Sequence, residues 1–309
     1  MRRFLLRSLA CGLFCLIVYC CGVVVTERWG PGFARRNLPF PERGNGMLYS
    51  RIRDVRAAGP VDVLVLGSSH AYRGYDPRIF AEGGLTLFNL GSSNQSPLQT
   101  EVLVGRYLDQ LAPALVIFDV YPWVFSVDGL ESTLDLLAND DCLRGAPALV
   151  LRQGNVKATN ALILAAQRKW SGAYARLTAD TARAADHYVP GGFVEREPAY
   201  YGGGTDGLDR YLAWNDAQFL AFGRILHRLR KRGVGVVLVQ SPVTGVQAAA
   251  YENLAGFNRR MRATGLRYLD WHATLPLDDR AHFFDSHHLN QAGVELFNRA
   301  LLEVLDEAP

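Results

Sequence analysis

Three short polar segments of the chain carry the residue types that acyl transfer requires. The first is residues 67–70 (Gly-Ser-Ser-His), which directly follow an apolar run and offer a serine hydroxyl as a nucleophile. Backbone N–H groups at such a strand-to-helix turn point outward and stabilise a developing oxyanion. The second segment is residues 89–94, in which Gly91 lets the backbone approach a substrate closely and offers its own N–H.

The third segment, residues 285–288 (Asp-Ser-His-His), supplies an acid and a base. Asp285 precedes His288 by three residues, so its carboxylate can accept from one imidazole nitrogen while the other nitrogen faces a serine. Each pattern alone is common, because a Gly-Ser-Ser turn is often only a turn and an Asp near a helix start is often only a cap. Together they predict a nucleophile, an oxyanion donor and an oriented base at one edge of a sheet.

The elements that would position these segments alternate along the chain. Short apolar runs rich in Val, Leu and Ile predict strands buried on both faces, at 61–66, 85–90, 114–120, 234–240 and 266–271. Amphipathic stripes with start signals at Ser96-Pro97, Asn215 and Asn290 predict helices between and after these strands. The alternation predicts an α/β fold, a three-layer α/β/α sandwich around a mainly parallel five-stranded sheet with right-handed crossovers.

The body also contains an insertion. More than a hundred residues separate the third and fourth expected strands, which is far more than one crossover helix needs. We expect an insertion at about 124–210, helical from about 130 to 186. Its second part, 187–209, is rich in aromatics and glycines, which suits either a binding loop or lid or a surface excursion without a function. The expected organisation is an anchor at 1–25, a stalk at 26–60 and an α/β domain at 61–309.

In these motifs the chain resembles the SGNH (GDSL-like) hydrolase superfamily, over residues 61 to about 305. Its first block corresponds to residues 67–69, and the Gly-Ser-Ser-His form is similar to the branch that acts in cell-envelope acylation, including D-alanyl transfer to teichoic acids and alginate acetylation. The resemblance implies Ser69 as the nucleophile, His288 as the general base and Asp285 as its orienting acid. It also implies that the N–H groups of Ser69 and Gly91 bind the oxyanion.

One block departs from the family pattern. Where the family has Gly-x-Asn-Asp after the third strand, this chain has residues 118–123 (Phe-Asp-Val-Tyr-Pro-Trp). The usual asparagine donor is therefore missing, and Asn94 is the candidate replacement. Losing one such donor costs about 3 kcal/mol of transition-state stabilisation, which suits a slow transferase or a protein that has given up catalysis.

The neighbouring histidine has two interpretations. His287 is most simply a partly exposed ring beside the helix start. A metal site could combine it with His70, Asp285 and His288, but adjacent histidines point in different directions in an extended segment and no ligand spacing is diagnostic. We therefore expect no metal and no cofactor.

The N-terminal segment is expected to cross a membrane. Residues 8–25 are 18 consecutive uncharged residues, which as a helix span about 27 Å against a hydrocarbon core of about 30 Å. Arg2, Arg3 and Arg7 keep their end in the cytoplasm. A cleaved signal peptide is the alternative, since small residues occur at 20–22, although no A-x-A-like site is evident. We expect an uncleaved single-pass anchor in the inner membrane, with the body outside.

Charge and cysteine usage narrow the function further. Outside the three N-terminal arginines the chain has 30 basic and 30 acidic residues, so it has no net field that would collect nucleic acids. Four of the five cysteines lie in the apolar segment, and Cys142 alone cannot form a disulfide within the body. The body must therefore be held together by its core.

These observations lead to two main hypotheses. The first is a membrane-anchored extracytoplasmic serine esterase or O-acyltransferase acting on acyl esters of an envelope or secreted polysaccharide. Its partners would be an acylated glycan or acyl donor and a membrane acyltransferase. The second is a catalytically weak or inactive protein of the same fold that binds glycan or such an acyltransferase. A secreted general lipase is a third alternative, which an anchored protein fits less well.

Overall fold

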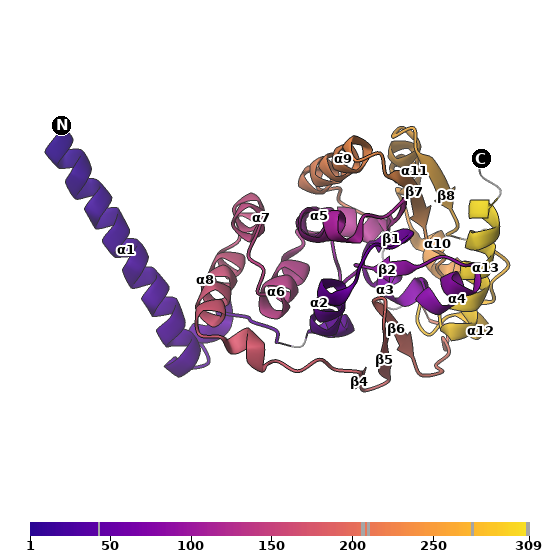
Figure 1. Ribbon diagram of the computed structural model, residues 1–309, viewed down its shortest axis with the longest axis horizontal. Coiled ribbons are helices and arrows are strands. Elements are labelled where there is room, and N and C mark those ends of the chain that lie inside the picture. Colours follow the sequence, from indigo (N-terminus) through magenta and orange to yellow (C-terminus); the bar gives the residue numbers. More distant parts are fainter. Residues whose placement is uncertain (43, 205–207, 209–210, 273–274, 307–309) are drawn as a thin grey trace.

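The computed structural model describes residues 1–42, 44–204, 208, 211–272 and 275–306 (Figure 1). The strands are β1 (Val63–Leu66), β2 (Leu87–Asn89), β3 (Leu115–Asp119), β4 (Ala182–Arg183), β5 (Asp186–Val189), β6 (Phe193–Arg196), β7 (Gly235–Gln240) and β8 (Arg267–Asp270). The longer helices are α1 (Arg2–Trp29), α2 (Leu48–Ala57), α5 (Pro97–Leu111), α6 (Leu130–Asn139), α7 (Ala146–Gln153), α8 (Val156–Trp170), α9 (Asp216–Lys231), α11 (Leu254–Arg262) and α13 (Gln291–Asp306). Short helices are α3 (Ser69–Gly74), α4 (Pro77–Glu82), α10 (Gly245–Ala250) and α12 (Asp279–His282), with 3-10 turns η1 (Ala34–Asn37), η2 (Asn45–Met47), η3 (Pro122–Phe125) and η4 (Ala173–Arg176).

The main sheet is parallel and has the order β2-β1-β3-β7-β8. Its five strands are the five apolar runs of the sequence, each shorter by one to three residues at its ends. Because every connection between parallel strands must cross over the sheet, the loops that follow the strands gather at one edge. The predicted fold class is confirmed.

Helices cover both faces of this sheet, as the three-layer prediction requires. On one face Leu64, Val116 and Leu238 pack against α2, α5, α9 and α11. On the other face Val65 and Ile117 pack against α3, α4 and α13. The alternation of side chains along each buried strand therefore fills two separate cores.

The second half of the expected stalk belongs to the folded body. Residues 48–57 form α2, and Leu48, Ile52 and Val55 of this helix are buried in the main core. These positions follow the i, i+4, i+7 spacing of a helix face, but charged residues between them hide the pattern in the sequence. Only residues 30–47 connect α1 to the body without a long helix.

The insertion is helical at first, as predicted, through α6, α7 and α8. The segment interpreted as a binding loop or surface excursion instead begins as a small antiparallel sheet of order β4-β5-β6. Gly191 and Gly192 have positive φ angles in the turn between β5 and β6, and their backbone packs against Leu87 and Asn89. This hairpin therefore braces the edge of the main sheet. Residues 205–207, 209 and 210 of the expected loop lie outside the described residues.

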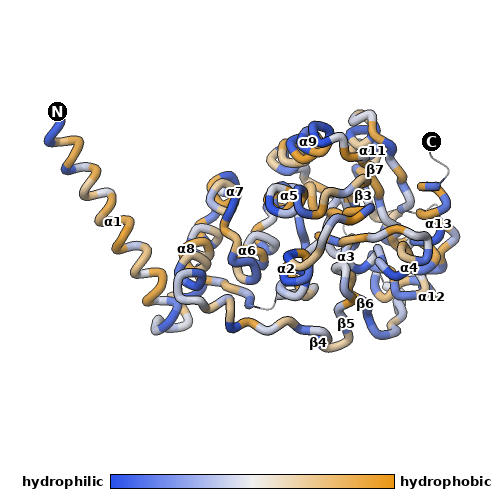
Figure 2. The backbone as a smooth tube through the Cα atoms, viewed as in Figure 1, coloured by the Kyte–Doolittle hydropathy of each residue, from blue (hydrophilic) through white to orange (hydrophobic). Residues whose placement is uncertain are grey.

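The first helix, α1, projects from the body (Figure 1). It is long and apolar enough to cross a membrane, with a mean hydropathy of 2.5 over its best window. Figure 2 shows apolar residues along most of its length, whereas apolar and polar residues alternate along the chain of the body.

Candidate active site

The serine-bearing segment lies at the carboxyl end of β1. Gly67 ends the strand with φ 151°, and a Cβ at this position would lie 2.8 Å from Cβ of Asp119. Glycine is therefore required for the tight turn from β1 into α3. Ser69 is the first residue of α3 and is half-buried, so its hydroxyl remains accessible. As a first-turn residue it has an N–H without a partner in the helix.

The acid and the base lie on the loop before α13. Oδ1 of Asp285 accepts hydrogen bonds from the backbone N–H groups of His287 and His288, at 2.9 and 2.8 Å. Its other oxygen, Oδ2, lies 2.8 Å from Nδ1 of His288. A carboxylate can only accept, so Nδ1 of His288 carries the proton and Nε2 presents a lone pair.

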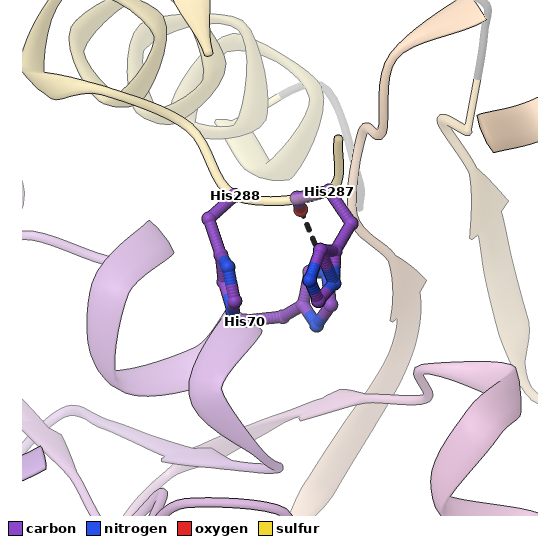
Figure 3. A group of neighbouring side chains, drawn as sticks. All are labelled: His70, His287 and His288. Carbon is purple, nitrogen blue, oxygen red and sulfur yellow. Dashed lines mark hydrogen bonds between the residues drawn. The ribbon is translucent and has the colours of Figure 1, made fainter. Parts of the chain in front are cut away.

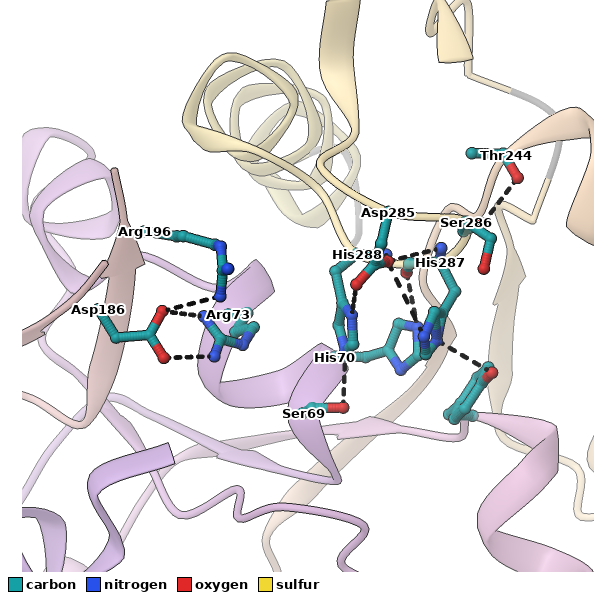
Figure 4. A network of polar contacts seen from close by, with 11 residues as sticks. Ser69, His70, Arg73, Asp186, Arg196, Thr244, Asp285, Ser286, His287 and His288 are labelled. Atoms are coloured by element: carbon teal, nitrogen blue, oxygen red, sulfur yellow. Dashed lines mark hydrogen bonds and ion pairs between the residues drawn. The ribbon is translucent and has the colours of Figure 1, made fainter. Parts of the chain in front are cut away.

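That lone pair faces the serine. Nε2 of His288 lies 2.8 Å from Oγ of Ser69, although the two residues are 219 positions apart in the chain (Figure 4). The hydroxyl therefore donates to the imidazole, and the imidazole donates to Asp285. This is the chain of hydrogen bonds by which a serine is activated as a nucleophile.

The surroundings of Asp285 favour its ionised form. Burial alone would raise the pKa of Asp285, but the hydrogen bond and charge of His288, together with the backbone N–H donors, lower this pKa below its ordinary value. A persistent carboxylate favours the imidazolium that forms when His288 takes a proton.

The structure corrects the prediction for Gly91. Its N–H donates to Oδ1 of Asn89 at 2.9 Å, so it is already paired and does not face an oxyanion. The amide of Asn89 also donates to the carbonyl of Ala71 at 2.6 Å. A Cβ on Gly91 would lie 2.8 Å from both Cβ of Ala71 and the carbonyl oxygen of Ser68. Glycine is therefore needed here because the turn packs directly against the helix that carries Ser69.

Asn94, the predicted replacement donor, lines the same cavity as Ser69. Its backbone is left-handed, with φ 48°, and its amide donates to Glu131 at 3.3 Å. One amide hydrogen points to Glu131, and a primary amide has a second. Asn94 therefore stays a prediction as an oxyanion donor.

The cavity beside Ser69 has a volume of about 290 Å³. It is lined by Ser68, Ser69, Ser93, Asn94, Tyr121, Trp123, Val124 and His287. Two of these residues, Tyr121 and Trp123, belong to the block that departs from the family pattern. The segment that has lost an asparagine thus contributes two aromatic side chains to the cavity wall.

His287 and His70 form a second layer around the base (Figure 3). Nε2 of His70 donates to the carbonyl of His287 at 2.8 Å, which ties α3 to the loop of the base. The ring of His70 packs 3.8 Å from that of Tyr121, whose hydroxyl lies 3.3 Å from Nδ1 of His287. Burial and the neighbouring His288 lower the pKa of His287 to about 3, so this ring is neutral. The side chain of His287 is 30% exposed, which agrees with the partly exposed ring expected from the sequence.

The metal alternative involves the same three histidines, whose nearest ligand nitrogens lie within 4.8 Å of one another. The rings of His70 and His288 are stacked, with centroids 5.0 Å apart and planes 25° apart. A metal ion must lie near the plane of each imidazole that binds it, whereas stacked rings present their faces to each other. The nitrogens of His288 are also engaged by Ser69 and Asp285. The arrangement therefore favours proton transfer over metal binding.

The insertion also contacts α3, the short helix that carries Ser69. Arg73 of α3 makes two hydrogen bonds to Asp186 of β5, at 2.9 and 2.7 Å, and Arg196 of β6 contacts the same carboxylate at 3.3 Å (Figure 4). Such bidentate arginine pairs fix geometry as well as charge. No sequence motif indicated this contact, because the partners lie more than a hundred positions apart.

A buried carboxyl lies under the Ser69 turn. Asp119 is fully buried at the end of β3, and the hydroxyls of Tyr75 and Ser241 donate to its Oδ2. Burial raises the pKa of Asp119 to about 7, although these hydroxyls favour the ionised form. In the sequence this residue stands out only as a single acid at the end of an otherwise apolar strand.

This carboxyl makes stability depend on pH. Because burial raises the pKa of Asp119 in the folded state well above the ordinary value of an aspartate, ionisation favours the unfolded state as pH rises between these two values. We expect Asp119→Asn to gain thermal stability relative to the natural protein as pH rises from about pH 4 to about pH 7. Melting temperatures of both proteins across this range test the effect, and a pH-independent difference would contradict it.

Comparisons with known proteins complete the description of the chain. No family model matches it, and no curated protein matches it in sequence. Similar solved structures include a proposed acylhydrolase from Bacteroides fragilis NCTC 9343, with 12% identity, a TM-score of 0.42 and coverage of 82% of this chain and 93% of that chain. A GDSL-like lipase from Bacteroides thetaiotaomicron VPI-5482 has 12% identity, a TM-score of 0.42 and coverage of 84% and 98%.

A third similar structure is a two-domain esterase active on acetylated mannans, with 14% identity and a TM-score of 0.37. The match covers 87% of this chain and 55% of the esterase, so the chain spans about half the length of that protein. The chain itself has an α/β fold whose parallel sheet has the order β2-β1-β3-β7-β8, and this fold brings Ser69, Asp285 and His288 together.

Proposed function

We propose that this protein is a serine esterase or O-acyltransferase that acts on acyl esters of an envelope or secreted polysaccharide through an acyl-enzyme. The observation that carries the proposal is the unbroken chain of hydrogen bonds from Ser69 through His288 to Asp285. A serine at a turn has no structural need for an oriented imidazole with an ionised partner. Such a combination is the constellation that makes a hydroxyl nucleophilic.

The reaction follows from the hydrogen-bond directions. Oγ of Ser69 attacks the acyl carbonyl while Nε2 of His288 takes the hydroxyl proton. The tetrahedral intermediate collapses, the acyl C–O bond to the alcohol breaks, and His288 returns the proton to the departing alkoxide. Water or a sugar hydroxyl then gives its proton to His288 and attacks the acyl carbonyl. The bond between the acyl carbon and Oγ of Ser69 breaks, His288 returns the proton to Oγ, and an acid or a new ester is released. The N–H of Ser69 is the backbone donor available for the oxyanion.

The cavity suits a small acyl group and a carbohydrate. Its volume of about 290 Å³ is at the small end of the range for ligand sites. Serine and asparagine side chains line it together with Tyr121 and Trp123. Aromatic faces pack against the apolar C–H faces of sugar rings, while hydroxyl and amide groups bond to sugar hydroxyls. An acetylated sugar fits these surfaces better than a long-chain lipid does.

The proposed location is the inner membrane, with the body on the extracytoplasmic side. The apolar helix α1 and the arginines at positions 2, 3 and 7 support this orientation. A body held at the membrane can meet a nascent glycan or a membrane acyltransferase that supplies the acyl group.

The alternative function is a protein of this fold that binds glycan or an acyltransferase without catalysis. The pairing of the Gly91 N–H with Asn89 favours this alternative, because it removes one expected oxyanion donor in addition to the missing asparagine. Each lost donor costs about 3 kcal/mol of transition-state stabilisation. The arrangement of Ser69, His288 and Asp285 favours the catalytic function.

The test uses the full-length protein in detergent with an acetyl ester donor, with and without an acceptor sugar. We expect acetate release without acceptor and acetylated sugar with it, both lost in Ser69→Ala. The matched control is Ser171→Ala, which removes an exposed hydroxyl at the end of α8, outside the cavity lining, and should retain activity. Equal turnover by the natural protein and Ser69→Ala would exclude the proposed chemistry. Binding of the sugar without turnover would establish the alternative.

A further inference from the structure

The anchor helix does not stand apart from the body but packs against α8 of the insertion. The hydroxyl of Tyr19 donates to Oδ1 of Asn160 at 2.5 Å, and the amide of Asn160 donates to the carbonyl of Asn37 at 2.9 Å. Val23 of α1 is buried at the same contact. The buried amide of Asn160 has a partner for both its oxygen and its nitrogen. It therefore fixes the position of α8 relative to α1, because a shift of either helix would leave a buried polar group without a partner.

This contact fixes the position of α8 along the axis of α1. The two helices lie side by side and run in the same sense (Figure 1). Both rise about 1.5 Å per residue, so Trp170 lies about level with Trp29, since each follows the Tyr19–Asn160 contact by ten residues. The turn between α7 and α8 precedes that contact and therefore lies beside the apolar part of α1.

Large apolar side chains are exposed along this side of the molecule. Leu151 and Val156 flank the α7–α8 turn and are 83% and 53% exposed. Trp29, Phe33 and Trp170 are 69%, 75% and 93% exposed beyond the end of the apolar segment. Single exposed apolar residues are ordinary, but here aliphatic residues lie beside the span and aromatic residues lie where a helix leaves the bilayer.

We propose that the α7–α8 turn rests in the outer interface of the bilayer that α1 crosses, with Leu151 and Val156 inserted among the acyl chains. This inference rests on the proposed membrane anchoring. Its occupant is lipid because Leu151 and Val156 are exposed at the turn that leads into α8, and α8 packs through Asn160 on the apolar helix α1.

The charges near the turn are compatible with this placement. Arg152 pairs with Glu101 at 2.8 Å and Glu101 also pairs with Arg224 at 2.8 Å, so the three side chains carry one net positive charge, which anionic lipid headgroups attract. Lys157 has a flexible stem that can bring its ammonium group to the lipid phosphates. The body therefore has two membrane contacts, α1 and the turn, and these hold it in one orientation on the bilayer.

The experiment measures the depth of labels on the full-length protein in phosphatidylethanolamine–phosphatidylglycerol vesicles. Single cysteines are introduced as Leu151→Cys or Val156→Cys in a chain whose native cysteines are replaced by alanine, and each carries an environment-sensitive fluorophore. The control is Leu296→Cys on α13, which is also exposed but lies on the side far from α1 (Figure 1). A chain that keeps only Cys15 reports on the anchor itself.

We expect nitroxides on the lipid acyl chains to quench labels at 151 and 156 severalfold more than the label at 296, and aqueous iodide to show the reverse order. Labels at 151 and 156 that respond like the label at 296, while the Cys15 label is quenched by lipid, would overturn the inference and leave the anchor intact. A Cys15 label untouched by lipid would overturn the anchoring and the inference together. Neither outcome bears on the chemistry of Ser69.

Discussion

Replacing the base, as His288→Ala, lowers kcat for ester hydrolysis by about four to six orders of magnitude. The reason is that Nε2 of His288 is the acceptor 2.8 Å from the hydroxyl of Ser69. Without it the hydroxyl keeps its proton, and a neutral serine is a poor nucleophile at neutral pH. Single-turnover and steady-state rates with a chromogenic acetyl ester measure the loss.

The adjacent histidine is the matched control for this variant. His287 lines the same cavity, but burial lowers its pKa to about 3 and its Nδ1 faces Tyr121. We therefore expect His287→Gln to change kcat far less than His288→Ala does. Equal losses in the two variants would contradict the assignment of the base and would favour a general requirement for an intact histidine loop.

Replacing the orienting acid, as Asp285→Asn, lowers kcat by about four orders of magnitude while changing KM little. Oδ2 of Asp285 holds the proton on Nδ1 of His288, and its Oδ1 binds the two backbone N–H groups of the loop. An amide can turn its NH2 group toward Nδ1, which stabilises the tautomer with the proton on the nitrogen that faces Ser69. That tautomer cannot accept the serine proton.

The control for this variant is Asp278→Asn. Asp278 caps α12 through the N–H groups of Arg280 and Ala281, so it performs the same local capping role without contacting the base. We expect this variant to lose a little stability and to retain kcat. Circular dichroism and melting curves for both variants separate the two effects. A kcat for Asp285→Asn within tenfold of the natural protein would exclude Asp285 as the orienting acid.

The sheet was predictable because its strands are buried on both faces and read as continuous apolar runs. The carboxyl ends of parallel strands share one edge, so the approach of Ser69 to His288 followed from the strand assignments alone. The spacing within residues 285–288 was equally informative, because in a tight loop the carboxylate of an acid reaches the imidazole of a histidine three residues later.

Other features depend on tertiary contacts that no local pattern carries. The N–H of Gly91 was expected to face a substrate, but it donates a hydrogen bond to the side chain of Asn89, two residues earlier. Helix α2 was missed because charged residues, one of them the fully buried Arg51, lie between its buried Leu48, Ile52 and Val55. The β5–β6 hairpin was missed because its glycines suggested a loop, whereas their positive φ angles form a tight turn.

The central claim is that Ser69 is an activated nucleophile, and covalent labelling tests it most directly. The full-length protein is treated with a fluorophosphonate, digested, and the modified residue is identified by mass spectrometry. We predict one phosphonyl group per chain, on Ser69, with labelling lost in Ser69→Ala and strongly slowed in His288→Ala. Absence of labelling on Ser69 in the natural protein, or labelling that persists unchanged in Ser69→Ala, would contradict the claim.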